Sequence, residues 1–296
     1  MLDEIIRQLA NETNSYNLYF TQKKQHSYDS YSPNIEGQIY KDLVALMIEH
    51  LSKMTSLEIV EYDPSGYTDR TIEKCDIDYV GNFDEISESF EEADEVDTEI
   101  NPDKFTFYCL EINGEVNIKI LRRVTKFKKL HAKGIIAMFN GNQLNKLDNK
   151  LIGIDGEIDL ICYGEKILIF SHYSLERIFR LSQQFQRKAS EFLNKLSHLN
   201  AIENIEQLKA DCLNDTRIQK ILTKMLNENL DLERTFNNFD NIEKTISMFD
   251  LNVEISPHPN PRIKYENKSQ IMDVIRIIRD SYYESLINQE LGIDDG

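Results

Sequence analysis

Residues 151–199 read LIGIDGEIDLICYGEKILIFSHYSLERIFRLSQQFQRKASEFLNKLSHL, and their hydrophobic period changes once, near Ser171. Before Ser171, apolar runs of strand length are separated by Asp155-Gly156 and Tyr163-Gly164, pairs typical of turns. After Ser171, apolar residues recur every three or four positions, as on one helical face. They are Leu175, Ile178, Phe179, Phe185, Ala189, Phe192, Leu193, Leu196 and Leu199. The stretch therefore predicts strands followed by one long helix that ends near Asn200.

The β pattern extends upstream to Lys104. Phe105, Phe107 and Cys109 alternate with polar residues, and Asn113-Gly114 is a strong two-residue hairpin signal. A continuous apolar run at 134–139 ends in the turn residues Asn140-Gly141-Asn142. We expect an antiparallel β-meander of about five or six strands over residues 104–170. The helix at 174–199 should pack on this sheet or on a second protomer.

The flanking regions predict shorter elements. Helices are expected at 1–13, 36–53, 203–213, 215–229, 241–250 and 268–286, and strands at 17–21, 57–61, 252–255 and 262–265. A Ser/Tyr/Pro-rich loop is expected at 26–33. The order predicts an α+β fold: a central antiparallel β-meander, a long following helix and a C-terminal helical region. We expect an N-terminal α/β region at 1–103, ending in an acidic segment, and a second region at 104–296 that holds the meander and the helices.

Composition excludes several classes of protein. The 296 residues are 41% hydrophobic, enough to bury a core, while the longest apolar runs are too short to cross a bilayer. The first residues carry acids within their hydrophobic pattern, unlike a secretory leader. The four cysteines are far apart, as expected of reduced thiols in a core. Together these features predict a cytoplasmic protein.

No catalytic signature is present. The chain has no P-loop, GxGxxG, GxSxG or HExxH string, and its six histidines are scattered. We therefore expect no cofactor, no metal and no small-molecule substrate, and we leave open whether the protein is an enzyme. One alternative is a metal-dependent nuclease, because Asp155, Glu157 and Asp159 would share one face of a strand. The other interpretation of these carboxylates is a solvent-facing hairpin edge.

Charge is distributed unevenly along the chain. The formal net charge is −17, and residues 84–99 contain nine acids and no base, which predicts a solvated face or a mobile loop. No acid occurs between Glu115 and Asp148, where bases concentrate. We expect DNA phosphates to be bound by Lys119, Arg122, Arg123, Lys126, Lys128, Lys129 and Lys133, with Phe127 and His131 available for stacking. The alternatives are that this segment pairs with the acidic run or contacts an acidic protein partner as an adaptor.

A second basic stripe lies on the expected long helix. It comprises Arg177, Arg180, Arg187, Lys188 and Lys195. A charged stripe opposite an apolar face is usually a solvated helical surface, and we interpret it so.

Two stretches resemble the bacterial KwaB family of the Kiwa anti-phage defence system. They are GIIAMFNGNQLNKLDNKLIGIDGEIDLICYGEKILIFSHYSLERIF at 134–179 and PRIKYENKSQIMDVIRIIRDSYYESLI at 261–287. The family's usual Phe-Glu pair at the start of the helix stands here as Leu175-Glu176.

The resemblance implies a function for the chain. It implies a cytoplasmic protein that associates with itself, most simply as a dimer, and binds DNA without marked sequence preference. It also implies joint action with a membrane protein of the KwaA type, which could recruit the chain to the inner membrane. No catalytic residue is carried over from the family. The leading hypothesis is therefore an antiviral DNA-binding protein, with the nuclease and the adaptor as alternatives.

Overall fold

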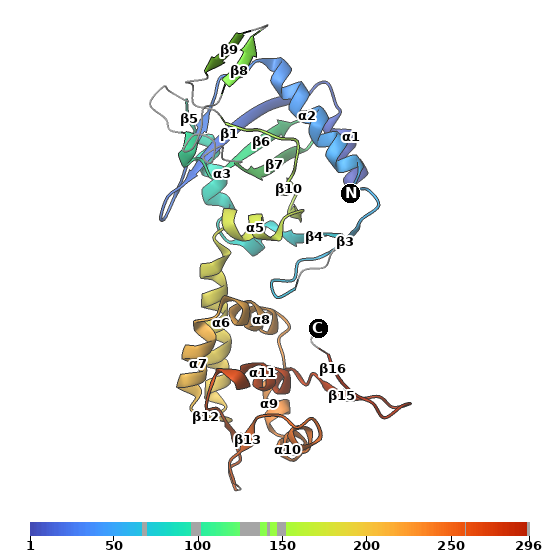
Figure 1. Ribbon diagram of the computed structural model, residues 1–296, viewed down its shortest axis with the longest axis vertical. Helices are drawn as coiled ribbons and strands as arrows, with labels where there is room; N and C mark the ends of the chain where they lie inside the picture. The colour runs from blue at the N-terminus through green and yellow to red at the C-terminus, as the bar shows by residue number, and fades with distance from the viewer. Residues whose placement is uncertain are drawn as a thin grey trace. The chain divides into compact units, whose positions relative to one another are not determined.

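The computed structural model describes residues 1–66, 70–95, 102–124, 137–140, 143–146, 152–257 and 259–294 (Figure 1). The chain forms two compact units. Unit 1 comprises Met1–Tyr62 and Thr68–Leu181, and unit 2 comprises Asp63–Tyr67 and Ser182–Gly296. The α+β class is confirmed, because a large sheet forms in unit 1 and most helices belong to unit 2. The boundary expected at residues 103/104 falls inside unit 1.

A nine-stranded sheet organises unit 1, in the order β3-β4-β11-β10-β7-β6-β1-β2-β5. Its strands are β1 (Ser15–Lys23), β2 (Tyr28–Ser32), β3 (Glu58–Glu61), β4 (Thr71–Asp76), β5 (Asp94–Glu95), β6 (Phe107–Asn113), β7 (Asn117–Arg123), β10 (Leu160–Tyr163) and β11 (Lys166–Ile169). Neighbours β6, β7, β10 and β11 pair antiparallel, as expected of the meander. β8 (Ala137–Asn140) and β9 (Gln143–Lys146) pair with each other in a separate sheet.

Two turns of the meander lie where the sequence signals place them, but the first is longer than expected. Asn113 belongs to β6 and pairs with Asn117, so the loop comprises residues 114–116 instead of the expected two-residue turn, and the register extends to Phe107 opposite Arg123. Between β10 and β11, Gly164 has a φ of +58°, which glycine adopts without a steric penalty. These turns fix the register, so the side chains that point into the core are determined by alternation.

The core of unit 1 lies between the sheet and two helices. In Figure 1, α1 (Leu2–Leu9) and α2 (Gly37–Ser52) lie side by side against the sheet. Alternate residues such as Leu18, Ile120 and Ile161 are buried in this cluster. Burying an aliphatic side chain of this size contributes about 1.5–3 kcal/mol. The other face carries Tyr19, which stacks on Phe90 of a helix in the acidic run.

That helix, α3 (Phe83–Glu91), confirms the expected solvated face for the described part of the acidic run, whose acids are exposed, and replaces the alternative of a loop over residues 83–91. Ile86 and Phe90 lie one helical turn apart and are both buried. The acids therefore occupy the opposite side of a packed helix, and residues 96–99 lie outside the described residues. The expectation of a loop at 26–33 is wrong, because Tyr28–Ser32 forms β2 and pairs with β1.

The long helix expected after Ser171 is two helices. α5 (His172–Ile178) and α6 (Leu181–His198) are separated by Arg180, whose φ of +53° ends the first helix. The Arg180 guanidinium donates to the backbone oxygens of Lys24 and Ser27 in the turn between β1 and β2. These tertiary hydrogen bonds outweigh the continuous helical pattern of the sequence, so the helix is interrupted at Arg180. The expected burial of Phe179, Phe185, Phe192 and Leu196 is confirmed.

Unit 2 is a helical cluster with a small sheet. Its elements after α6 are β12 (Ile202–Glu203), α7 (Ile205–Leu213), α8 (Thr216–Asn227), α9 (Leu232–Phe236), α10 (Phe239–Met248), β13 (Glu254–Ile255), β14 (Ile263–Lys264) and α11 (Ile271–Arg279). The helix expected to reach 286 ends at Arg279, because Asp280 is left-handed. A hairpin of β15 (Tyr282–Glu284) and β16 (Leu291–Ile293) follows. In the described part of the chain, no helix is long and apolar enough to span a membrane.

Candidate functional site

The residues expected to bind DNA divide into two groups. Lys119, Arg122 and Arg123 lie on β7. The remaining residues of that prediction lie outside the described residues: Lys126, Lys128, Lys129 and Lys133, together with Phe127 and His131. The structure therefore describes the surroundings of the first group.

Lys119 and Arg122 are engaged within unit 1. Lys119 Nζ lies 3.0 Å from Oε1 of Glu111, its cross-strand partner on β6. The Arg122 guanidinium contacts three carboxylates: Asp155 through Nε at 3.1 Å, Asp159 through Nη1 at 2.8 Å, and Glu157 through Nη2. Burial alone would lower the pKa of Arg122, but its hydrogen bonds and charge interactions with Asp155 and Asp159 raise it. Arg122 is thus a fixed internal cation.

The carboxylates considered for a nuclease lie close together, but they surround a cation of the chain itself. Asp155, Glu157 and Asp159 all contact the guanidinium of Arg122. Asp159 is buried, with 4% of its side chain exposed, and both its oxygens accept hydrogen bonds from β7. Lys166 pairs with Asp76. Within the described ranges, no group of three His, Cys, Asp or Glu side chains is arranged to hold a metal ion. The arrangement can brace β7 against residues 155–159, and it leaves Arg123 to face elsewhere.

Arg123 lines a cavity of about 510 Å³ in unit 1, here called the Tyr173 pocket. The pocket collects side chains from the end of β1, the start of β6, the end of β7 and α5. Its lining residues are Lys23, Thr106, Phe107, Arg123, Val124, Tyr173, Arg177 and Ile178. Among the residues that the structure describes, the lining contains three cations and no carboxylate.

Tyr173 contacts two arginines of the pocket. The guanidinium carbon of Arg123 is 4.6 Å from the centre of the Tyr173 ring, and that of Arg177 is 5.1 Å from it. Both distances fall within the range of cation–π attraction. Tyr173 is 51% exposed, so it can be reached from solvent. The ring therefore gathers two like charges at one accessible place.

Lys23 is the third cation of the pocket, and its surroundings disfavour its charge. Its Nζ donates to the backbone oxygen of Arg177 at 2.7 Å. The pKa of Lys23 is lowered, first by burial and then by the charges of Arg180 and Arg177. A lowered lysine pKa means that the surroundings disfavour the protonated form, here mainly through burial and in part through repulsion by Arg180 and Arg177. A bound anion would relieve this repulsion.

Local contacts hold both sides of the pocket. Arg123 donates its backbone N–H to Oδ2 of Asp159 at 2.8 Å, which fixes the end of β7. Tyr28 Oη donates to the backbone oxygen of Ile178 at 2.8 Å and thereby ties the start of β2 to the end of α5. At the start of α5, His172 lies between Glu73 on β4 and Glu176. The site is therefore built on braced elements.

Sequence reasoning identified one of the pocket's cations as a DNA-binding residue, Arg123. Arg177 was assigned to a solvated helical stripe, while Lys23 and Tyr173 were missed. Arg177 is exposed, but its position beside Arg123 depends on the sheet order. A cluster of basic residues beside an exposed aromatic residue can indicate a phosphate-binding site. Here the cluster becomes visible only once the order of the strands in the sheet is known.

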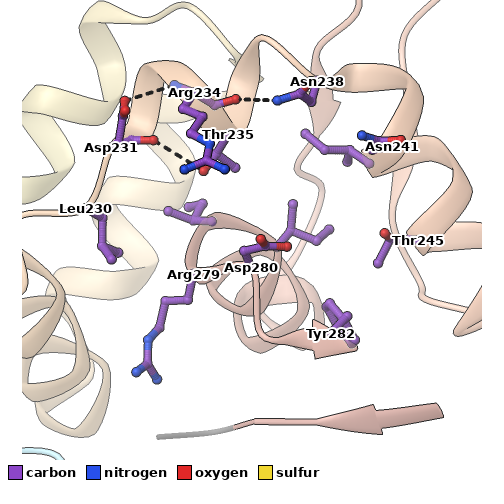
Figure 2. A pocket seen from close by; sticks show the side chains of 13 residues that line it. Leu230, Asp231, Arg234, Thr235, Asn238, Asn241, Thr245, Arg279, Asp280 and Tyr282 are labelled. Atoms are coloured by element: carbon purple, nitrogen blue, oxygen red, sulfur yellow. Dashed lines mark hydrogen bonds between the residues drawn. The ribbon is translucent and has the colours of Figure 1, made fainter. Parts of the chain in front are cut away.

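A second cavity, of about 400 Å³, lies in unit 2 among α9, α10 and α11. Figure 2 shows Arg234 and Asp280 lining it from different elements, with Asp231 beside Arg234. Asp231 Oδ1 accepts the backbone N–H of Arg234 at 3.0 Å. Because its lining mixes both signs of charge, this cavity is less suited to a polyanion than the Tyr173 pocket.

The chain matches a known protein family. Residues 103–288 match the family model described as Kiwa protein KwaB-like. No curated protein and no solved structure matches the chain. The matched region includes Arg123, Tyr173 and Arg177, whereas Lys23 lies before it.

Proposed function

Since the chain belongs to the KwaB-like family of Kiwa proteins, a family of anti-phage defence, we propose that it binds DNA without sequence preference. The observation that carries this proposal is the Tyr173 pocket. Lys23, Arg123 and Arg177 line one cavity, and no carboxylate lies in the described part of its lining. Guanidinium and ammonium groups so placed bind phosphate oxygens.

The overall charge of −17 does not oppose local binding. Association with a polyanion depends on the field near the contact surface, whereas total charge mainly affects solubility and non-specific encounter. Acids close to the pocket are already engaged, since Asp159 binds Arg122 and Glu176, next to Arg177 in the chain, lies 3.1 Å from His172. A phosphate at Arg123 and Arg177 would therefore meet a positive field.

The expected basic segment adjoins the pocket in sequence. Val124 lines the pocket, and residues 125–133 directly after it include Lys126, Lys128, Lys129 and Lys133. Contacts from these lysines would reach phosphates beyond the one in the pocket. Phosphate contacts carry no base sequence information, which accounts for binding to all sequences alike.

The resemblance supports three further parts of the proposal. The protein is cytoplasmic, associates as a dimer and acts with a membrane protein of the KwaA type that brings it to the inner membrane. The exposed apolar tip of the β15–β16 hairpin, Leu286 and Ile287, offers surface for a protein contact. DNA captured by the pocket would then be held near the membrane.

Fluorescence anisotropy on two unrelated duplexes tests DNA binding. The double variant Arg123→Glu/Arg177→Glu should weaken binding to both duplexes by about tenfold or more, because two phosphate contacts become repulsive. The control Lys41→Glu/Lys244→Glu makes the same change in net charge at exposed residues outside the pocket lining and should retain the parent's affinity. Absence of binding by the parent at low salt would refute the function. Equal affinity of parent and pocket variant would refute the site.

A further inference from the structure

The cations of the Tyr173 pocket are concentrated on one point. Arg123 and Arg177 contact the same ring at 4.6 and 5.1 Å, and Lys23 binds the backbone of Arg177. Three cations that line one cavity can surround one phosphate group, whereas a duplex surface presents its phosphates in a row. An internal phosphodiester carries one negative charge, while a terminal phosphomonoester carries about 1.5 to 2 at pH 7. The pocket's charge therefore matches a terminal phosphate better than an internal one.

The rest of the pocket suits a nucleoside. Phe107 and Ile178 are buried beneath the cavity, and Val124 is half-buried at its edge. The volume of about 510 Å³ lies within the range typical of small-ligand sites. Tyr173, which is 51% exposed, and the guanidinium groups of Arg123 and Arg177 are all groups on which a base can stack. The site thus combines a phosphate locus with an apolar and stacking surface.

We propose that the Tyr173 pocket receives the phosphorylated end of a DNA strand. This inference rests on the proposed DNA binding and specifies the part of the DNA that enters the site. The body of a duplex is convex and stays outside a cavity of this size, whereas a strand end can enter it. The terminal phosphate lies among Lys23, Arg123 and Arg177, and the terminal base packs on the apolar floor.

The test compares one duplex sequence in three forms with the full-length protein. One form has 5′-phosphate ends, one has 5′-hydroxyl ends, and one is closed by a hairpin loop at each end. We expect the phosphorylated form to bind about tenfold more tightly than the hydroxyl form, because charge-assisted hydrogen bonds are lost with the phosphate. The closed form should bind most weakly. The variant Arg123→Gln/Arg177→Gln should abolish the difference between the first two forms, and Lys41→Gln/Lys244→Gln should preserve it.

Each of the other outcomes would overturn the proposed strand-end binding. Equal affinity for the three forms overturns strand-end binding and leaves the proposed DNA binding intact, whereas no binding to any form removes both. A nucleoside 5′-monophosphate that competes as well, mole for mole, as the phosphorylated ends would show that the pocket takes a free nucleotide instead. Thermal unfolding confirms that the glutamine variant is folded. If it is not, the single variant Arg177→Gln, at an exposed residue, replaces it.

Discussion

Nη1 of Arg122 donates to Oδ1 of Asp159 at 2.8 Å, and the other oxygen of that carboxylate accepts the backbone N–H of the next residue, Arg123. One buried acid therefore positions two neighbouring arginines, Arg122 through its side chain and Arg123 through its backbone. Successive strand residues point to opposite faces, so Arg122 turns to the carboxylates while Arg123 turns to Tyr173. The string Asp155-Gly-Glu157-Ile-Asp159 is thus a receptor for Arg122, and it supports the pocket through the backbone of β7.

Replacing Arg122 by alanine should destabilise the protein. The change leaves the buried Asp159 without its cation, and breaking a buried ion pair costs about 3 kcal/mol. Urea denaturation should show this loss as a lower midpoint. Lys166→Ala is the control, because the pair of Lys166 with Asp76 is exposed and should contribute far less. An Arg122→Ala protein as stable as the parent would show that Asp159 is solvated and that the cluster is no brace.

Gly156 should not tolerate a side chain. A Cβ at this position would lie 2.5 Å from Cβ of Leu46 and 3.0 Å from its backbone carbonyl carbon on α2. Gly156→Ala must therefore push residues 155–157 away from α2, and overpacking of this kind costs about 1–3 kcal/mol. Gly37→Ala is the matched control, since a Cβ there meets nothing within 4 Å. Equal melting temperatures for the two variants would contradict the close approach.

His172 should make stability depend on pH. Its Nδ1 lies 2.9 Å from Glu73 and its Nε2 3.1 Å from Glu176. Burial by itself would lower the pKa of His172, but hydrogen bonds with Glu176 and Glu73 outweigh it and raise the pKa to about 9. The folded pKa thus exceeds the unfolded value near 6.5. The stabilisation is complete below about pH 6.5 and is lost as the pH rises through about 9.

Denaturation of the parent and of His172→Gln at pH 6, 7.5 and 9 checks this dependence. The difference in stability between the two proteins should shrink steadily across that series. A difference that stays constant or grows with pH would show that the imidazole is neutral in the folded protein.

Phe185 tests the packing of unit 2. It is 1% exposed, and truncation to alanine should lower the free energy of unfolding by about 3–5 kcal/mol. Tyr283→Ala removes an aromatic ring that is 54% exposed and should change stability little. Thermal and urea unfolding measure both variants. A near-neutral Phe185→Ala would mean that this face of α6 is not packed.

The sequence predicted those features that depend on neighbours in the chain. The Asn113-Gly114 hairpin and the apolar face of α6 follow from local turn chemistry and period. The break at Arg180 could not be foreseen, because no glycine or proline marks it and its hydrogen bonds reach Lys24 and Ser27. A tertiary contact, rather than local propensity, selected that conformation.

The candidate site was predictable to a similar extent. Arg123 lay in a segment without acids, so its basic character was visible in the sequence. Its neighbours in the pocket were hidden, since Lys23 and Tyr173 meet it only through the strand order β10-β7-β6-β1 and the position of α5. The pairing of Arg122 was likewise unforeseen, because its carboxylates lie more than thirty residues further along the chain.

The lysine segment and the Tyr173 pocket should contribute to DNA binding in separable ways. If about four to six phosphates are contacted, the affinity of the parent should fall with salt with a log–log slope of roughly −4 to −5. The variant Lys126→Glu/Lys128→Glu/Lys129→Glu should weaken binding to every DNA form alike and reduce that slope by about 2 to 3, since three phosphate contacts disappear. It should keep the preference for 5′-phosphate ends, because the pocket is untouched. The variant Arg123→Gln/Arg177→Gln should lose that preference and keep most of the salt dependence. A control that reverses Lys41, Lys53 and Lys244 makes the same change in net charge and should leave both properties in place. If the triple lysine variant binds DNA as tightly as the parent, those lysines meet acids of their own chain or of a protein partner, and the phosphate contacts belong to the pocket alone.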